Sequence, residues 1–175
     1  MINETDIPVN LTSEPEKISG FETPEPVIAV IRVDADACPA SVRRILERTA
    51  RKNQIRLVFY IDDSHELEPE YGTVIRVGQG HDAVDLALVN QAAAGDLIIT
   101  QDYGLGALAL ARKALVLHPS GLVLDDGNID QLLFERHISA RIRKAGGRTS
   151  HLHKRTTAYD QSFEKQLQLM IKKIL

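Results

Sequence analysis

The chain is poor in cysteine and in aromatic residues, and it contains no long apolar run. One cysteine among 175 residues permits no internal disulfide, which is typical of proteins in a reducing compartment. Aromatic residues make up 5% of the chain and tryptophan is absent, which argues against a surface that stacks single-stranded bases. No apolar run approaches the roughly 20 residues that span a bilayer, and the N-terminus does not have the pattern of a signal peptide. We therefore expect a cytoplasmic protein without a membrane partner.

Charge is distributed unevenly along the chain. Residues 1–26 carry six acids against one lysine, hold four of the seven prolines and show no periodicity, so we expect a disordered acidic tail. Residues 27–175 are long enough to form a single domain with its own core. Residues 136–175 contain ten Lys and Arg against two acids, which predicts a basic helical segment. That segment is either a binding surface for an anionic ligand or a solvated helix face.

Strand and helix patterns alternate along the predicted domain. Short β-branched runs predict strands, and apolar residues at helical spacing predict helices between them. This alternation is typical of a mostly parallel sheet covered on both faces, so we expect an α/β three-layer sandwich. Asp125 or Asp126 is the expected cap of the fourth helix. The expected strands cover residues 27–33, 55–61, 73–77, 96–100 and 114–118, and the expected helices 42–50, 81–94, 105–113, 125–144 and 157–174.

Acidic residues follow two of the expected buried strands. Asp34 and Asp36 come directly after the first strand, and Pro39 stands at a natural first position of a helix. Asp102 follows the fourth strand. If these strands are neighbours, the three carboxylates meet at the carboxyl edge of the sheet, where open α/β sheets bind their ligands. Like charges at one edge repel each other unless a cation relieves them, so the pattern predicts a metal site.

Two further acids, Asp82 and Asp85, lie three residues apart at the start of the expected helix 81–94. They therefore lie on one side of that helix. Capping and the helix dipole account for Asp82 without a metal. They account less well for Asp85, because its neighbours are small and apolar. Asp96 is interpreted as a turn acid, and Asp62, Asp63, Glu66, Glu68 and Glu70 as a solvated loop.

Four segments of the chain match, in order, the sequence pattern of a known family. They are residues 33–39, 80–85, 95–102 and 146–149, and together they resemble the YaiI/YqxD family of uncharacterised bacterial proteins. The resemblance covers residue 27 to the C-terminus. The strand-end acids and the acid of the middle helix also resemble a PIN-like nuclease domain. The 26-residue tail is extra, and residues 150–155 replace a Gly-Pro stretch of the family.

The resemblance implies metal-dependent hydrolysis of phosphodiester bonds in RNA or DNA. Carboxylates would hold Mg²⁺ or Mn²⁺, hard cations that prefer oxygen ligands. The implied metal ligands are Asp34, Asp36, Asp82, Asp85 and Asp102, with Asp34, Asp36, Asp85 and Asp102 in catalysis and Asp36 either a ligand or a support for one. Nucleic acid, RNA in the first place, is the expected partner. The implied substrate-binding residues are Thr100, Arg143, Lys144 and Arg148.

Two alternatives to a nuclease remain open. The first is a non-catalytic PIN-like module that binds nucleic acid or regulates, with acids that are vestigial or hold a structural metal. The second is a haloacid-dehalogenase-type phosphatase, in which Asp34 attacks phosphorus and Asp36 acts as acid and base. The remaining residues of that second interpretation are Thr100, Lys113, Asp125 and Asp126.

Cysteine and histidine give weaker signals. Cys38 and Arg44 have the spacing of a tyrosine-phosphatase loop, but Pro39 removes an amide that such a loop needs and nearby acids oppose thiolate formation. We therefore expect Cys38 to be structural. His81 adjoins the acids and is either a ligand, a proton relay or an exposed residue. The remaining histidines, His65, His118, His137, His151 and His153, have no zinc-type spacing, so no zinc site is predicted.

Overall fold

The fold is an α/β three-layer sandwich, as the alternating pattern predicts. The computed structural model describes residues 29–78, 82–146 and 155–172. Six strands form one sheet in the order β3-β2-β1-β4-β5-β6, parallel except for the antiparallel β6 at the edge. The strands are β1 (Val30–Asp34), β2 (Arg56–Asp62), β3 (Thr73–Val77), β4 (Leu97–Ile99), β5 (Leu115–Leu117) and β6 (Val123–Leu124).

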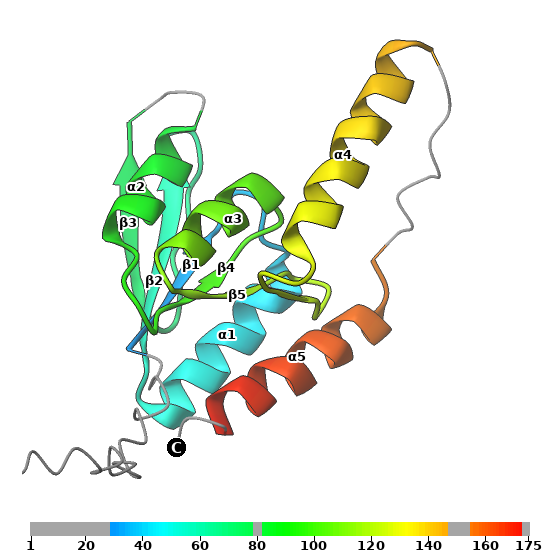
Figure 1. Cartoon of the computed structure of the whole chain (residues 1–175). Helices are drawn as coiled ribbons and strands as arrows, with labels where there is room; N and C mark the ends of the chain where they lie inside the picture. Colours follow the sequence, from blue (N-terminus) through cyan, green and yellow to red (C-terminus); the bar gives the residue numbers. More distant parts are fainter. Residues whose placement is uncertain (1–28, 79–81, 147–154, 173–175) are drawn as a thin grey trace, which may run out of the picture.

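Helices cover both faces of the sheet (Figure 1). The core on one face is formed with α1 and α5, and the core on the other with α2, α3 and the first turns of α4. The sheet thus separates two apolar clusters, which is the arrangement that a doubly covered parallel sheet requires. The helices are α1 (Ala40–Asn53), α2 (Ala83–Gln91), α3 (Tyr103–Ala111), α4 (Ile129–Lys144) and α5 (Thr157–Lys172).

The central strand β1 sends alternate side chains to the two cores. Ile31 and Val33 are fully buried on the side of α1 and α5. Arg32 and Asp34 point to the other side, toward α2 and α3. Charged residues therefore alternate with the buried apolar residues Ile31 and Val33, and the strand places Asp34 at its carboxyl end.

The sequence located most elements to within a few residues. Helix α1 buries Val42, Ile45, Leu46, Thr49 and Ala50, which are the positions that its periodicity predicted. Strand β6 was missed, because two residues at an antiparallel edge leave no pattern. The expected cap of α4 was wrong: Asn128 precedes the helix, while Asp125 accepts a hydrogen bond from Gly127 in the turn before it.

Helix α4 extends beyond the sheet, whereas α5 packs against α1 (Figure 1). Ile129, in the first turn, is the buried residue of α4. Helix α5 is fixed by Asp160, which accepts hydrogen bonds from Ser41 at 2.9 Å and from Arg155 at 2.6 Å. Phe163 of the same helix is fully buried. The two C-terminal helices thus differ: one belongs to the core and the other projects from it.

The predicted acidic tail lies outside the described residues, so the division at residue 26 stays a prediction. Within the described part of the chain, no helix has the length and apolarity needed to cross a bilayer.

Candidate metal centre

The carboxyl ends of β1 and β4 lie side by side, because these strands pair directly in parallel. Asp34 ends β1, and Thr100 follows β4. The Thr100 hydroxyl donates a hydrogen bond of 2.9 Å to Asp34 Oδ2, and the same oxygen of Thr100 accepts one of 3.0 Å from the Asp102 amide. The two strand ends thus form one polar edge that includes Asp34, Thr100 and Asp102.

Asp34 is a buried carboxylate among other carboxylates. The residue is 7% exposed, and it has no ion pair within the described residues. Burial raises the pKa of Asp34 to about 6, and repulsion from Asp85 and Asp36 adds to that rise, against the opposing hydrogen bonds from Thr100 and Ala37. Asp36 and Asp85 therefore both lie within electrostatic reach of Asp34. A divalent cation at this edge would relieve that repulsion.

Asp102 is engaged as a helix cap. Its Oδ1 accepts hydrogen bonds from the amides of Gly104 at 2.6 Å and Leu105 at 3.2 Å, at the start of α3. Its Oδ2 forms an ion pair of 2.9 Å with Arg136 of α4. Burial alone would raise the pKa of Asp102, but the bonds from Arg136 and the two amides outweigh it and lower the pKa. Asp102 thus joins α3 and α4 at the acidic edge.

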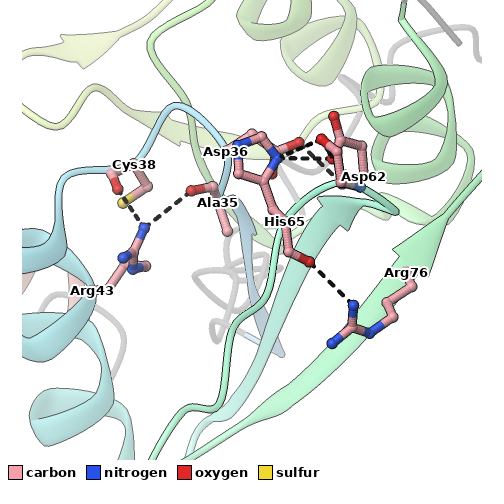
Figure 2. A network of polar contacts seen from close by, with 8 residues as sticks. Ala35, Asp36, Cys38, Arg43, Asp62, His65 and Arg76 are labelled. Atoms are coloured by element: carbon pink, nitrogen blue, oxygen red, sulfur yellow. Dashed lines mark hydrogen bonds and ion pairs between the residues drawn. The ribbon is translucent and has the colours of Figure 1, made fainter. Parts of the chain in front are cut away.

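Asp36 belongs to a second group of side chains, formed with Asp62 and His65 (Figure 2). One ligand atom from each lies within 4.8 Å of the other two. His65 Nδ1 is 2.8 Å from Asp62 Oδ1 and 3.2 Å from Asp36 Oδ1. Hydrogen bonds from Ser64 and His65 lower the pKa of Asp62 to about 2, and Asp62 and Asp36 raise the pKa of His65.

The sequence pattern does not predict Asp62 or His65 as site residues. It places Asp62 in a solvated loop and gives His65 no role, because no short-range spacing connects either residue to Asp36. The signal that could have found them was that Asp62 ends a strand, as Asp34 does. Asp34 at the end of β1 pairs in register with Tyr60, so Asp36, two residues beyond β1, comes level with Asp62, the last residue of β2.

The remaining predicted acid, Asp82, is exposed at the N-cap of α2. Its backbone has a φ of 74°, in the left-handed region that non-glycine residues rarely adopt. Asp85 lies in the first turn of the helix and is half-buried. Helix α2 thus brings the charge of Asp85 close enough to raise the pKa of Asp34. His81 lies outside the described residues.

The loop between β1 and α1 is held by Arg43 (Figure 2). Its guanidinium donates hydrogen bonds to the carbonyls of Cys38 at 2.9 Å and Ala35 at 3.3 Å. Cys38 is 4% exposed, and burial raises the pKa of its thiol to about 12. A neutral thiol is a poor nucleophile, so this geometry supports the structural role that the sequence predicts for Cys38.

The phosphatase alternative fails on the position of its lysine and its second acid pair. The carbonyl of Lys113 accepts a hydrogen bond from the Gly95 amide, just before β4 begins, so Lys113 lies at the amino edge of the sheet. Asp125 and Asp126 follow the antiparallel β6 and lie at that same edge. Asp34 lies at the opposite edge, so these groups cannot act on one phosphate.

The predicted substrate-binding residues are spread over two elements. Thr100 is buried beside Asp34, whereas Arg143 and Lys144 are exposed in the last turn of α4. Arg136 lies on the same helix and reaches the acidic edge through Asp102. Arg148, His151 and His153 lie outside the described residues.

A mostly parallel α/β sandwich with an acidic carboxyl edge is a class of domain that binds its ligands where the parallel strands end. Within that class, the chain belongs to the uncharacterised YaiI/YqxD family, whose model matches residues 32–173. The match includes the whole sheet except the first two residues of β1. The family resemblance found in the sequence is thereby confirmed.

Curated relatives support the same assignment. A UPF0178 protein of Ruminiclostridium cellulolyticum is 49% identical over 142 residues, which are 81% of this chain and 92% of the relative. A UPF0178 protein of Lachnoclostridium phytofermentans is 48% identical over 147 residues, 82% of this chain and 97% of the relative. A UPF0178 protein of Exiguobacterium sibiricum is 45% identical over 142 residues, 81% and 95% respectively. No solved structure gives a significant match.

Proposed function

We propose that the protein is a metal-dependent nuclease that hydrolyses phosphodiester bonds, with RNA as its first candidate substrate. The observation that carries the proposal is the buried carboxylate of Asp34, whose pKa is raised by burial and by Asp85 and Asp36. Uncompensated buried carboxylates destabilise a fold unless the site has a use for their charge. A divalent cation is the ligand that such a site fits.

The donor set suits Mg²⁺ or Mn²⁺. Asp34, Asp36 and Asp85 offer carboxylate oxygens at one edge of the sheet, and hard divalent ions prefer such ligands. When bound, the ion would activate a water molecule and stabilise charge on the attacking and leaving oxygens. Thr100 orients Asp34 by its 2.9 Å hydrogen bond and is itself fully buried, so the carboxylate is held in one direction.

Asp102 has a different part in this proposal from Asp34. Both of its oxygens are engaged, one by the amides that start α3 and the other by Arg136. In this arrangement Asp102 positions Arg136 at the acidic edge. The direct ligation predicted for Asp102 competes with Arg136 for Oδ2, and an incoming phosphate can draw Arg136 away by accepting hydrogen bonds from its guanidinium.

Helix α4 supplies the proposed contact with the nucleic-acid backbone. Arg143 follows Arg136 by seven residues, so it lies on nearly the same helix face about 10 Å farther from the site. Lys144 lies beside it in the exposed last turn. A phosphate backbone running along this projecting helix would meet one cation at the acidic edge and two near the helix end.

A non-catalytic nucleic-acid-binding module is the second candidate. The observation in its favour is the Arg136–Asp102 ion pair, which fills one predicted ligand position with a cation of the protein itself. Such a module would bind the nucleic-acid backbone through the basic residues of α4, and the raised pKa of Asp34 would have no part in its function.

Cleavage of labelled RNA and DNA by the full chain in Mn²⁺ or Mg²⁺ separates the two candidates. For a nuclease, Asp34→Asn should lower the cleavage rate about 100-fold or more, because removal of a carboxylate ligand costs at least what loss of an outer partner does. Asp126→Asn is the matched control, since Asp126 is exposed at the opposite edge of the sheet. RNA binding without metal-dependent cleavage by the wild type would instead support the module.

A further inference from the structure

Three side chains that the proposed nuclease centre does not fully use come together next to it. Asp36 follows β1, Asp62 ends β2, and His65 lies in the turn after β2 (Figure 2). The parallel register that pairs Asp34 with Tyr60 brings Asp36 level with Asp62. The contact is direct, because the Asp62 amide donates a 3.1 Å hydrogen bond to Asp36 Oδ2. This hydrogen bond holds the Asp36 carboxylate against the backbone of Asp62.

The turn after β2 brings the imidazole back to these carboxylates. Asp62 Oδ1 accepts hydrogen bonds from the Ser64 amide at 2.8 Å and the Ser64 hydroxyl at 2.6 Å, which closes the turn. Arg76 of β3 donates a 3.1 Å hydrogen bond to the His65 carbonyl and ties the turn to the next strand. The backbone around His65 is thus held on both sides, and the His65 ring contacts the two carboxylates.

We propose that Asp36, Asp62 and His65 form a binding site for a divalent transition ion that favours imidazole, such as Zn²⁺, in preference to Mg²⁺. The ring nitrogen lies 2.8 Å from one carboxylate oxygen and 3.2 Å from the other. A tetrahedral ion with bonds of about 2.1 Å holds its ligands about 3.4 Å apart, so small adjustments produce a ligating geometry. The three residues leave one position open for water or for a substrate oxygen.

The imidazole decides which metal the site selects. Mg²⁺ takes oxygen ligands and keeps several of its waters, whereas transition ions bind imidazole nitrogen readily. The Asp34 centre offers carboxylates and a hydroxyl, and the His65 site adds a nitrogen. Asp36 contributes to both groups, since it raises the pKa of Asp34 and lies 3.2 Å from His65. The two sites are therefore adjacent and chemically distinct, and metal binding at His65 does not require nuclease activity.

Titration of the full chain with Zn²⁺, in excess Mg²⁺, tests the proposal. The chain has six histidines, so the specific readout is the ¹⁵N resonance of the His65 ring, assigned by its loss in His65→Gln. We expect Zn²⁺ to shift that resonance, and His65→Gln to weaken Zn²⁺ binding about tenfold or more. His137→Gln is the matched control, because His137 is exposed on α4. Asp62→Asn should also weaken Zn²⁺ binding.

The proposal is overturned if the His65 ring does not respond to Zn²⁺, or if His65→Gln binds as tightly as the wild type. Asp34→Asn separates it from the nuclease proposal, since that variant should keep the zinc response of His65. If the chain binds Zn²⁺ through His65 but cleaves no nucleic acid, the nuclease proposal is contradicted and the zinc-site proposal is supported. If the chain cleaves RNA but the His65 ring does not respond to Zn²⁺, the zinc-site proposal is contradicted and the nuclease proposal is supported.

Discussion

Two aspartates are buried at opposite edges of the same sheet, and their electrostatic surroundings differ. Asp96 lies at the amino edge, just before β4, and is 1% exposed. It forms a 2.8 Å ion pair with Arg32 and accepts a 3.0 Å hydrogen bond from the Ala93 amide. Asp34 lies at the carboxyl edge, is 7% exposed, and accepts its side-chain hydrogen bond from a neutral hydroxyl.

The charge of Asp96 is neutralised within the fold, whereas the charge of Asp34 is not. The partner of Asp96 is itself fixed, because Arg32 also donates a 2.6 Å hydrogen bond to the Tyr60 hydroxyl, which in turn donates one of 3.0 Å to Gln91. The strongest charges acting on Asp34 are those of Asp85 and Asp36, which repel it. Tolerated repulsion of this kind is typical of sites that bind cations.

Asp96→Asn should have the largest effect on stability. Loss of one partner leaves the charge of Arg32 buried without its counter-ion, which costs about 3 kcal/mol or more. Urea denaturation at pH 7 measures the change, and Asp126→Asn, at an exposed acid, should stay within about 0.5 kcal/mol of the wild type. An Asp96→Asn protein as stable as the wild type would show that the pair does not stabilise the fold.

Asp34→Asn should change stability in the opposite direction. The pKa of Asp34 is raised to about 6 in the fold, above that of the unfolded chain, so the folded protein holds this proton more tightly. Stability is therefore lost as the pH rises from about 4 to about 6, and the cost of roughly 2–3 kcal/mol persists above that range. Asn cannot ionise and keeps an oxygen for Thr100, so it avoids this cost.

Thermal melts in chelator at pH 4 and pH 8 check this prediction. The variant should match the wild type at pH 4 and exceed it at pH 8, and saturating Mn²⁺ should narrow the difference by stabilising the wild type. A variant that melts below the wild type at pH 8 would show that the Asp34 charge stabilises the fold, as that of Asp96 is expected to, and would contradict the proposed metal centre.

The smallest effect is expected at the end of α4. Replacement of Arg143 and Lys144 by Ala should weaken RNA binding by about three- to tenfold. The plot of log affinity against log salt concentration should become less steep by about one unit for each phosphate that the variant no longer neutralises. Stability should change little, since both residues are exposed. Lys52→Ala with Lys165→Ala is the matched control, which removes two exposed charges from α1 and α5. Equal weakening in both double variants would show that RNA binding follows net charge alone.

The fold class was predictable because the order of apolar and polar residues along the chain indicates which face of each element is buried. The mostly apolar segments 30–34 and 56–62, and the periodicity of α1, reflect which face each element buries. The acids at strand ends were also predictable, because parallel strands share one carboxyl edge. The two-residue β6 was not, because it is defined only by its pairing with β5. The Asn128 cap was not either, because it depends on the turn in which the Asn128 side chain donates a hydrogen bond to the Val123 carbonyl.

The candidate site was predicted only in part, for a reason that Asp102 and His65 illustrate. The sequence places Asp102 at the correct edge, yet its engagement by Arg136 joins residues 34 positions apart. His65 had no recognisable spacing, and its ring meets Asp36 only because β1 and β2 pair in one register. Residue type and strand position can be inferred from a sequence, but partners across the fold cannot.

Local pattern was enough to establish the family, the α/β class, the burial pattern of α1 and the edge at which acids gather. Those properties follow from periodicity and from the order of strands and helices along the chain. Packing in three dimensions was needed to establish that Asp96 is neutralised by Arg32 while Asp34 faces other carboxylates. The physical reason is that the energy of a buried charge depends on its neighbours in space, and strand pairing and helix packing choose those neighbours.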